Sequence, residues 1–301
     1  MITKYSHNNL TWIDIESPTG DDIASIVQEF SVHPTWAQEL LEPSARAKTD
    51  STEHTFYAAL HYPDHPSRTR DGNEIEVDYI IGEHFLITAH YGPIDIFTYL
   101  QKQFEAASTL GTVEAHNGPE LFLILNNELY RGLREELEPI RKEIKDIESN
   151  IFKGREFHMV RELSDLQRRL LDFKQSIRPH KIILKSLHLQ ASHLFPKYSI
   201  NEDNIFRDYS RVENALENAR ELLKELRDTN DSLLTAKNND VTKRLTLMAF
   251  VTFPLTLVAT VLLAAESPAI FHGEHGFFIV VGVLIAMYLV MHIYFAYKKW
   301  I

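Results

Sequence analysis

The chain has 301 residues, a formal net charge of -11 and no cysteine. The negative charge, in a sequence without a basic patch interleaved with aromatic residues, argues against nucleic acid as a partner. The lack of thiols excludes disulfides and thiolate metal sites, so any metal ion must be bound by oxygen atoms or by imidazole.

Residues 1–118 have the pattern of a mixed α/β domain. Short apolar and β-branched stretches, bounded by turn residues, predict strands over residues 10–15, 55–61, 75–82 and 85–91. Helical spacing that begins near a proline predicts helices over residues 21–30 and 35–41.

Residues 119–198 are expected to form a long helical hairpin. Leucine and isoleucine recur every three or four residues from Leu121 to Ile151, which is typical of an amphipathic helix. Gly154 interrupts this pattern, and a second helix is predicted over residues 160–194. The two helices should lie antiparallel.

A third helical segment, residues 199–244, is expected to form a stalk. It opens with Ser199 and Glu202 at capping-box spacing, in which the two side chains satisfy free amides at a helix start. Apolar residues then alternate in steps of four and three from Ile205 to Leu233, a heptad seam. The seam could pack on copies of the same helix or, in its upper part, on the hairpin of the same chain.

Two uncharged apolar stretches close the sequence, residues 245–265 and 276–297, with lengths of 21 and 22 residues. At about 1.5 Å per residue each is long enough to cross a bilayer core of about 30 Å. Lysine and arginine flank the stretches at residues 237–244 and 298–299, whereas the loop over residues 266–275 has neither. The positive-inside rule therefore predicts a multi-pass protein of the inner or plasma membrane with both termini cytoplasmic, the C-terminal segment being residues 276–301.

Four short motifs occur in this chain in an order and spacing that resemble one transporter family. They are Ile177-Arg178-Pro179, Phe206-Arg207-Asp208, Phe253-Pro254-Leu255-Thr256 and Tyr297-Lys298-Lys299-Trp300. With them, the chain resembles the CorA family of divalent metal ion transporters over essentially its whole length. The resemblance implies an α+β membrane protein, with a cytoplasmic α/β/α domain, a long helical stalk and two C-terminal transmembrane helices. It also implies a homopentameric funnel in which the first spans line a central pore.

The resemblance, matched through residues 254–256, places eight residues on the pore side. Independently of the family, their steps of three or four residues keep them on one helix face. Hydroxyls, one amide and two bulky apolar residues on that face suit the passage of a hydrated cation through polar rings and hydrophobic constrictions. The alternative is that the threonine hydroxyls only bond backbone carbonyls one turn back. The eight residues are Asn239, Thr242, Leu245, Thr246, Ala249, Phe253, Thr256 and Thr260.

The chain departs from the family at the outer mouth of this span. The family has Gly-Met-Asn where this chain has Leu263, Ala264 and Ala265. Magnesium releases its water reluctantly, and the alanines offer no side-chain oxygen to read its hydration shell, so both magnesium selectivity and inward transport are open. Glu266 follows directly and would form a ring of five carboxylates that concentrates cations, unless it is a solvated glutamate at the end of a loop.

Two further metal sites are expected, and each has an alternative interpretation without a metal ion. His272, Glu274 and His275 in the external loop are zinc-type ligands, although short polar loops contain such residues by chance. In the family, cytoplasmic divalent ions held between subunits by aspartates keep the pore shut, and the resemblance gives Asp208 this role. The exact partner of Asp208 is open, and the best candidate is Asp64, which follows the predicted strand ending at His61. The alternative for Asp208 is a solvated charge that is favourable near a helix N-terminus.

We therefore expect a CorA-like channel or transporter that moves divalent cations, magnesium first, and is gated by cytoplasmic divalent ions. A zinc or transition-metal transporter of broad selectivity, and a non-conducting metal sensor or membrane scaffold, are the alternatives. The expected partners are the lipid bilayer, divalent ions and further copies of the chain. The sequence has scattered histidines and no glycine-rich phosphate loop, so an enzyme is not expected.

Overall fold

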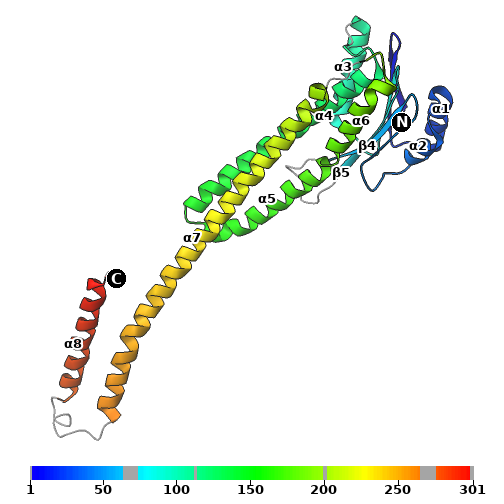
Figure 1. Ribbon diagram of the computed structural model, residues 1–301. Coiled ribbons are helices and arrows are strands. Elements are labelled where there is room, and N and C mark those ends of the chain that lie inside the picture. Colours follow the sequence, from blue (N-terminus) through cyan, green and yellow to red (C-terminus); the bar gives the residue numbers. More distant parts are fainter. Residues whose placement is uncertain (1, 64–73, 112–113, 199–201, 265–275, 299–301) are drawn as a thin grey trace. The chain divides into compact units, whose positions relative to one another are not determined.

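The computed structural model describes residues 2–63, 74–111, 114–198, 202–264 and 276–298. The chain divides into two units, Met1–Asn230 and Asp231–Ile301, and each is described by itself. The first unit contains a sheet with helices on both faces, and the second contains two long helices (Figure 1).

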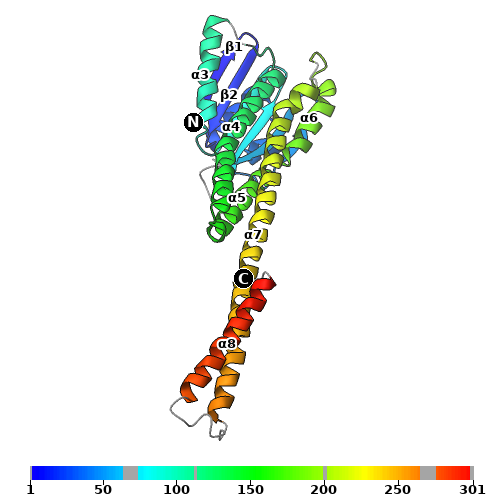
Figure 2. The same ribbon diagram turned by 90° about the vertical axis from the view of Figure 1, so that its left-hand side faces the viewer.

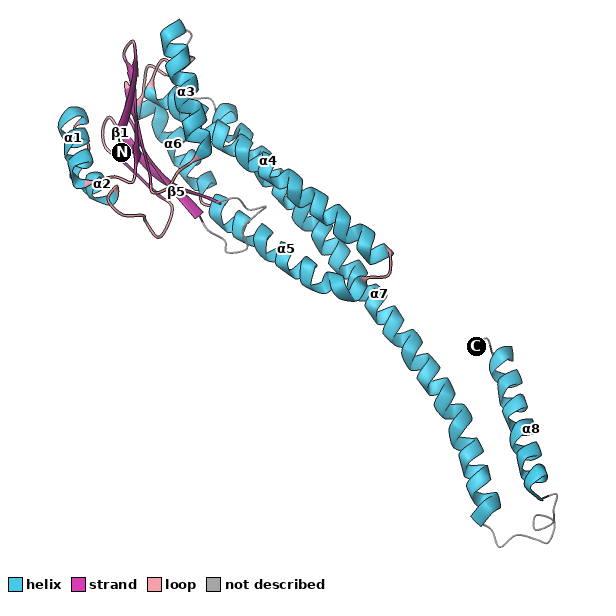
Figure 3. Cartoon of the chain, turned by 180° about the vertical axis from the view of Figure 1, so that it is seen from behind, coloured by secondary structure: helices cyan, strands magenta, loops and turns pink. Residues whose placement is uncertain are grey.

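The sheet has six strands in the order β1-β2-β6-β5-β4-β3, and its strands are coloured magenta in Figure 3. All neighbouring strands are antiparallel except β2 and β6, which pair in parallel from Thr11 opposite Phe85 to Glu16 opposite His90. The central strands are buried on both faces, which explains their nearly continuous apolar sequences. The strands are β1 (Ile2–His7), β2 (Leu10–Glu16), β3 (Lys48–Ser51), β4 (Phe56–Pro63), β5 (Glu74–Ile81) and β6 (Phe85–His90).

Short helices cover one face of the sheet, and longer helices cover the other (Figure 1). On the first face, α1 (Gly20–Phe30) and α2 (Pro34–Glu39) pack Ile26 and Trp36 onto the apolar side chains of β2, β5 and β6. The Thr19 side chain accepts a hydrogen bond from the Asp22 amide and caps α1. On the second face lie α3 (Asp95–Leu110) and the start of α4 (Gly118–Phe152), where the Phe122 ring meets Tyr79 at 5.0 Å.

The predicted helical hairpin is confirmed in its first helix and wrong in its second. The repeat from Leu121 to Ile151 is the buried face of α4, as expected. Instead of one helix over residues 160–194, the chain forms α5 (Glu156–Ile177) and α6 (His180–Leu194). Pro179 interrupts the helical hydrogen-bond ladder because it has no amide hydrogen to donate, while Arg178 and Pro179 both keep right-handed helical backbone angles.

A single helix of 63 residues, α7 (Glu202–Ala264), runs from the first unit into the second. In the first unit Ile205, Val212 and Leu216 of its seam are buried, so the upper seam packs within the chain rather than on copies. The Tyr209 ring contacts Tyr130 of α4 at 5.7 Å. Pro254 lies inside the helix. The expected cap at Ser199 falls outside the described residues.

The second unit consists of the lower part of α7 and of α8 (Gly276–Tyr297), which lies beside it (Figure 2). Both helices are long and apolar enough to cross a membrane. Phe250 of α7 and Val290, Met291, Tyr294 and Phe295 of α8 line an apolar cleft of about 420 Å³ between them.

Candidate ion pathway and regulatory site

The lower part of α7 has two different faces. Leu247, Val251, Pro254, Leu255 and Val258 are half-buried and follow one another at helical spacing. The opposite face carries the residues predicted to line a pore. Of these Ala249 is half-buried and the other seven are exposed, among them Leu245 at 61% and Phe253 at 74%.

The threonine hydroxyls on the exposed face bond to the helix backbone. Those of Thr246, Thr256 and Thr260 donate to the carbonyl oxygens four residues earlier, at 2.8, 2.8 and 2.7 Å. This is the alternative considered for them, and it uses only the proton of each hydroxyl. The oxygen lone pairs remain, so the face presents hydrogen-bond acceptors.

The outer mouth is described only in part. Leu263 and Ala264 lie in the last turn of α7. The outer-mouth residues Ala265 and Glu266, the expected loop ligands His272, Glu274 and His275, and the regulatory candidate Asp64 lie outside the described residues.

Asp208 lies near the start of α7 and has charged partners within the chain. Its Oδ1 accepts a hydrogen bond from Arg211 Nη1 at 3.0 Å, and its Oδ2 lies 3.6 Å from Arg207 Nε. A metal ion at Asp208 would therefore compete with two arginines of the same helix. Within the described residues no three His, Asp or Glu side chains are grouped to hold a metal ion.

Glu128 of α4 is the acidic neighbour of Asp208 across the helix interface. Burial raises the pKa of Glu128, the Arg131 guanidinium opposes this rise, and the Asp208 carboxylate adds to it. The two carboxylates thus repel each other, which is the arrangement that a bound cation would relieve.

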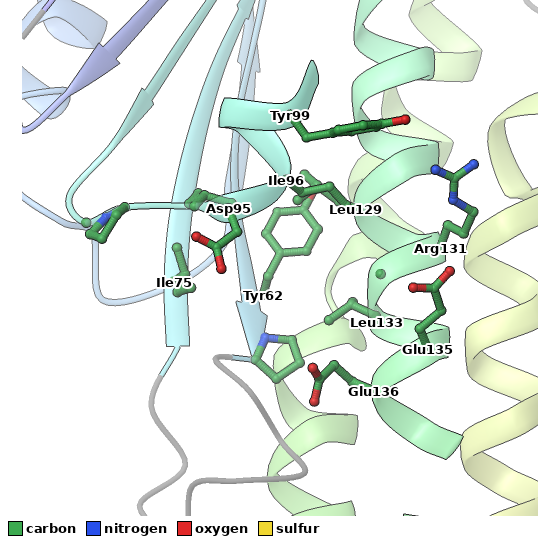
Figure 4. Close-up of a pocket in the computed structure, with 15 residues that line it drawn as sticks. Tyr62, Ile75, Asp95, Ile96, Tyr99, Leu129, Arg131, Leu133, Glu135 and Glu136 are labelled. Carbon is green, nitrogen blue, oxygen red and sulfur yellow. The ribbon is translucent and has the colours of Figure 1, made fainter. Parts of the chain in front are cut away.

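A cleft of about 790 Å³ opens between the ends of β4 and β5, the start of α3 and the middle of α4 (Figure 4). Tyr62, Ile75 and Leu133 give it an apolar lining. Asp95 lines it from α3, and Glu135 and Glu136 line it from α4. The acidic groups come from separate helices, and we assign the cleft no ligand.

Sequence reasoning missed a buried polar cluster on the face of the sheet that α2 covers. Asp78 of β5 is fully buried and accepts hydrogen bonds from the hydroxyls of Tyr57 at 2.8 Å and Tyr91 at 3.0 Å. Burial, together with the nearby Glu76 carboxylate, raises the pKa of Asp78 to about 7. The signal was an acidic residue inside the buried part of β5, where Val77, Tyr79, Ile80 and Ile81 surround it in sequence.

Comparison with known proteins extends over nearly the whole chain. Residues 7–299 match the family model described as CorA-like Mg2+ transporter protein. The cobalt/magnesium transport protein CorA of Thermotoga maritima is 23% identical over 97% of this chain and 83% of its own length. The magnesium transport protein CorA of Helicobacter pylori 26695 is 22% identical over 98% of this chain and 92% of its own.

Solved structures share the fold. The complete CorA magnesium transporter from Methanocaldococcus jannaschii has a TM-score of 0.78 and 16% identity, and covers 99% of this chain and 94% of its own. The ZntB cytoplasmic domain from Vibrio parahaemolyticus has a TM-score of 0.57 and 14% identity, and covers 78% of this chain and 98% of its own.

Proposed function

This chain belongs to the CorA family, and on that premise we propose that it is a homopentameric channel-like transporter of divalent cations, with magnesium the first candidate. Relatives named for magnesium and cobalt transport support the class of cargo. The proposal places both termini in the cytoplasm and the α7 spans around the pore.

The observation that carries the proposal is the division of α7 into two faces. Its half-buried positions form one face of the span, and the threonine-bearing face is exposed in the single chain. Five copies around an axis would turn Thr256 and Thr260 into rings of oxygen acceptors, and Leu245 and Phe253 into narrow apolar rings. Polar rings that replace or bind the outer water of an ion, with apolar constrictions that gate it, are a known pore design.

The proposed regulation uses Asp208 at subunit boundaries. Carboxylates gathered there repel each other, and a cytoplasmic divalent ion would neutralise them and favour a closed, symmetric assembly. Glu128 adds to this repulsion on its own subunit. Arg207 and Arg211 compete with the ion for the Asp208 carboxylate, so the ion must bind this carboxylate more tightly than the two arginines do.

The altered outer mouth favours a second candidate. Because Leu263, Ala264 and Ala265 supply no side-chain oxygen, selection would rest on the Glu266 carboxylates and would be broad, extending to zinc and other transition metals. A protein that has lost its filter altogether would be a non-conducting metal sensor or scaffold.

Ion flux into proteoliposomes separates these functions. The purified chain is reconstituted, its pentameric state is measured by light scattering, and uptake of magnesium, zinc, cobalt and nickel is compared with that of protein-free vesicles. Magnesium uptake above the others supports the first proposal, and equal uptake of all four supports broad selectivity. Correctly inserted pentamers that carry none of the four ions would contradict transport and leave the sensor.

A further inference from the structure

The turn between α4 and α5 carries exposed aromatic side chains. This hairpin tip, residues 152–161, reverses direction at Gly154, whose φ of 85° suits glycine. Phe152 is 68% exposed, Phe157 80% and Val160 44%, and of the other large apolar residues of these two helices only Leu171 is also exposed. Large apolar side chains gathered on a surface turn indicate a contact that the single chain does not provide.

The charge around these side chains is positive in a chain with a net charge of -11. Lys153, Arg155 and Arg161 are exposed, as is His158, whereas Glu156 is buried and the next exposed carboxylate along α5 is Glu162. Arg161 lies 4.0 Å from Asp165, one turn further into α5, and Arg155 donates to the neutral Asn150 side chain. The hairpin tip therefore presents two phenylalanines beside the exposed cations Lys153 and Arg155.

Contacts inside the first unit show which end of it the hairpin tip occupies. Lys174 of α5 pairs with Glu217 of α7, and further toward the tip Gln167 bonds to Arg227 at 2.8 Å. α5 thus runs antiparallel to α7, and the tip lies at the end from which α7 leaves the unit. From there α7 continues without a break to the apolar residues of its span.

We propose that the hairpin tip docks on the anionic cytoplasmic surface of the bilayer that the chain itself crosses. Phenylalanine partitions into the headgroup region, and each nearby lysine or arginine gains about 1 kcal/mol from acidic lipids. The inference rests on the cytoplasmic placement of the first unit in the proposed function. The tip needs a partner that is negatively charged and that also buries apolar side chains. A bilayer with acidic lipids has both properties, so it fits the tip better than a second copy of the chain does.

The absence of cysteine allows a direct test in the full chain. Phe157→Cys, labelled with the fluorophore NBD, is reconstituted in nanodiscs that contain phosphatidylcholine with or without phosphatidylglycerol. Docking predicts a blue shift and quenching by lipid-borne nitroxide in the anionic discs, with both lost at high salt. Lys153→Glu with Arg155→Glu should lower the docked fraction more than about tenfold, since two attractive charges become repulsive.

Two controls keep the result specific. Leu110→Cys, an equally exposed apolar position at the end of α3 without basic neighbours in sequence, should stay unquenched in all discs. Phe152→Cys repeats the measurement at a second position of the tip.

Labels that remain in water in anionic discs, or quenching that is equal in neutral discs and insensitive to salt, would overturn the proposal. Proximity between labels of neighbouring copies without lipid quenching would overturn it in favour of a subunit contact. Both faces of the bilayer are accessible in a nanodisc, and the fluorescence readout does not require ion flux. A protein that docks but moves no ion would therefore contradict only the proposed transport.

Discussion

The Tyr130 hydroxyl lies 2.9 Å from His180 Nδ1, deep between α4 and α6. The other ring nitrogen, Nε2, is 2.8 Å from the His61 carbonyl oxygen, which can only accept, so Nε2 carries the proton. Tyr130 must then donate to Nδ1. Burial lowers the pKa of His180 to about 4, which keeps the ring neutral and fixes this pattern near pH 7.

Tyr130→Phe should destabilise the first unit, because it leaves the buried Nδ1 of His180 without a donor. We expect the free energy of unfolding to fall by about 1–3 kcal/mol. Urea unfolding of the full chain, followed by the fluorescence of the buried Trp12 and Trp36, measures it. Tyr209→Phe is the matched control. Its hydroxyl donates to Glu213, which is partly exposed and can bond to water instead, so the loss of stability should be much smaller. Equal losses for both variants would contradict this assignment.

Asp78→Asn should change how the stability of the first unit depends on pH. The pKa of Asp78 is raised to about 7 in the folded chain and is about 4 when unfolded, so the folded state holds the proton more tightly. The contribution of this raised pKa to the free energy of unfolding is complete below pH 4 and is lost as pH rises through 7. The variant should therefore gain stability relative to the parent between pH 5 and pH 8, as seen by urea unfolding. Asp146→Asn, an exposed change on α4, should show no such trend.

Cysteine substitutions should distinguish the two faces of α7. At Thr256 and Thr260 they should react with water-soluble thiol reagents or crosslink between copies, because a pore admits water. At Val258, which is half-buried on the other face of the same helix, and at Leu284 of α8, they should stay unreactive. Mass spectrometry of the modified protein reads the result. The reverse pattern would place the second span inside.

Asp208→Lys should remove inhibition by internal magnesium, since a fixed positive charge replaces the ion. Flux is measured in vesicles loaded with a series of magnesium concentrations, and the half-inhibitory concentration should rise by at least about tenfold, the effect of 1.4 kcal/mol. Glu221→Lys, a charge reversal at an exposed position of the same helix, should leave the inhibition curve in place. An unchanged curve for Asp208→Lys would make the residue a structural partner of Arg207 and Arg211.

Glu266→Gln should raise the concentration for half-maximal flux, and more so at low ionic strength, where screening is weak. Glu274→Gln, another loop carboxylate, is the control. Restoring the family triplet with Leu263→Gly, Ala264→Met and Ala265→Asn should sharpen the preference for magnesium over nickel in competition assays. A parent that already prefers magnesium strongly and is unaffected by Glu266→Gln would show that selection happens at the threonine rings.

Most of the fold could be predicted because its elements have strong apolar patterns. The central strands are short apolar runs that are buried on both faces, and the helix from Leu121 to Ile151 has a buried face that repeats in the sequence. β1 and β3 are edge strands with few buried side chains, so their alternation is weak. The break at Pro179 was missed because the apolar repeat continues on both sides of it.

Of the candidate site, only the part that lies on a single helix could be predicted from the sequence. The face of α7 follows from spacing along a single element, whereas partners for Asp208 come from other helices or other copies. Asp78 was missed for the same reason. Its partners Tyr57 and Tyr91 come from the neighbouring strand β4 and from the end of β6, and no local pattern announces that contact.

Pro254 creates a flexible joint in α7, a position at which the long helix bends more easily than elsewhere. Proline has no amide hydrogen, so the carbonyl of Phe250, one turn earlier, loses its helical hydrogen bond. A regular helix would transmit a twist from one end to the other. A helix that lacks one backbone hydrogen bond bends at that point first. Thr256 and Thr260 lie beyond this joint, and Leu245 and Thr246 lie before it. In the proposed pore, the rings before Pro254 and the rings beyond it would therefore open to different extents when the same torque acts on α7.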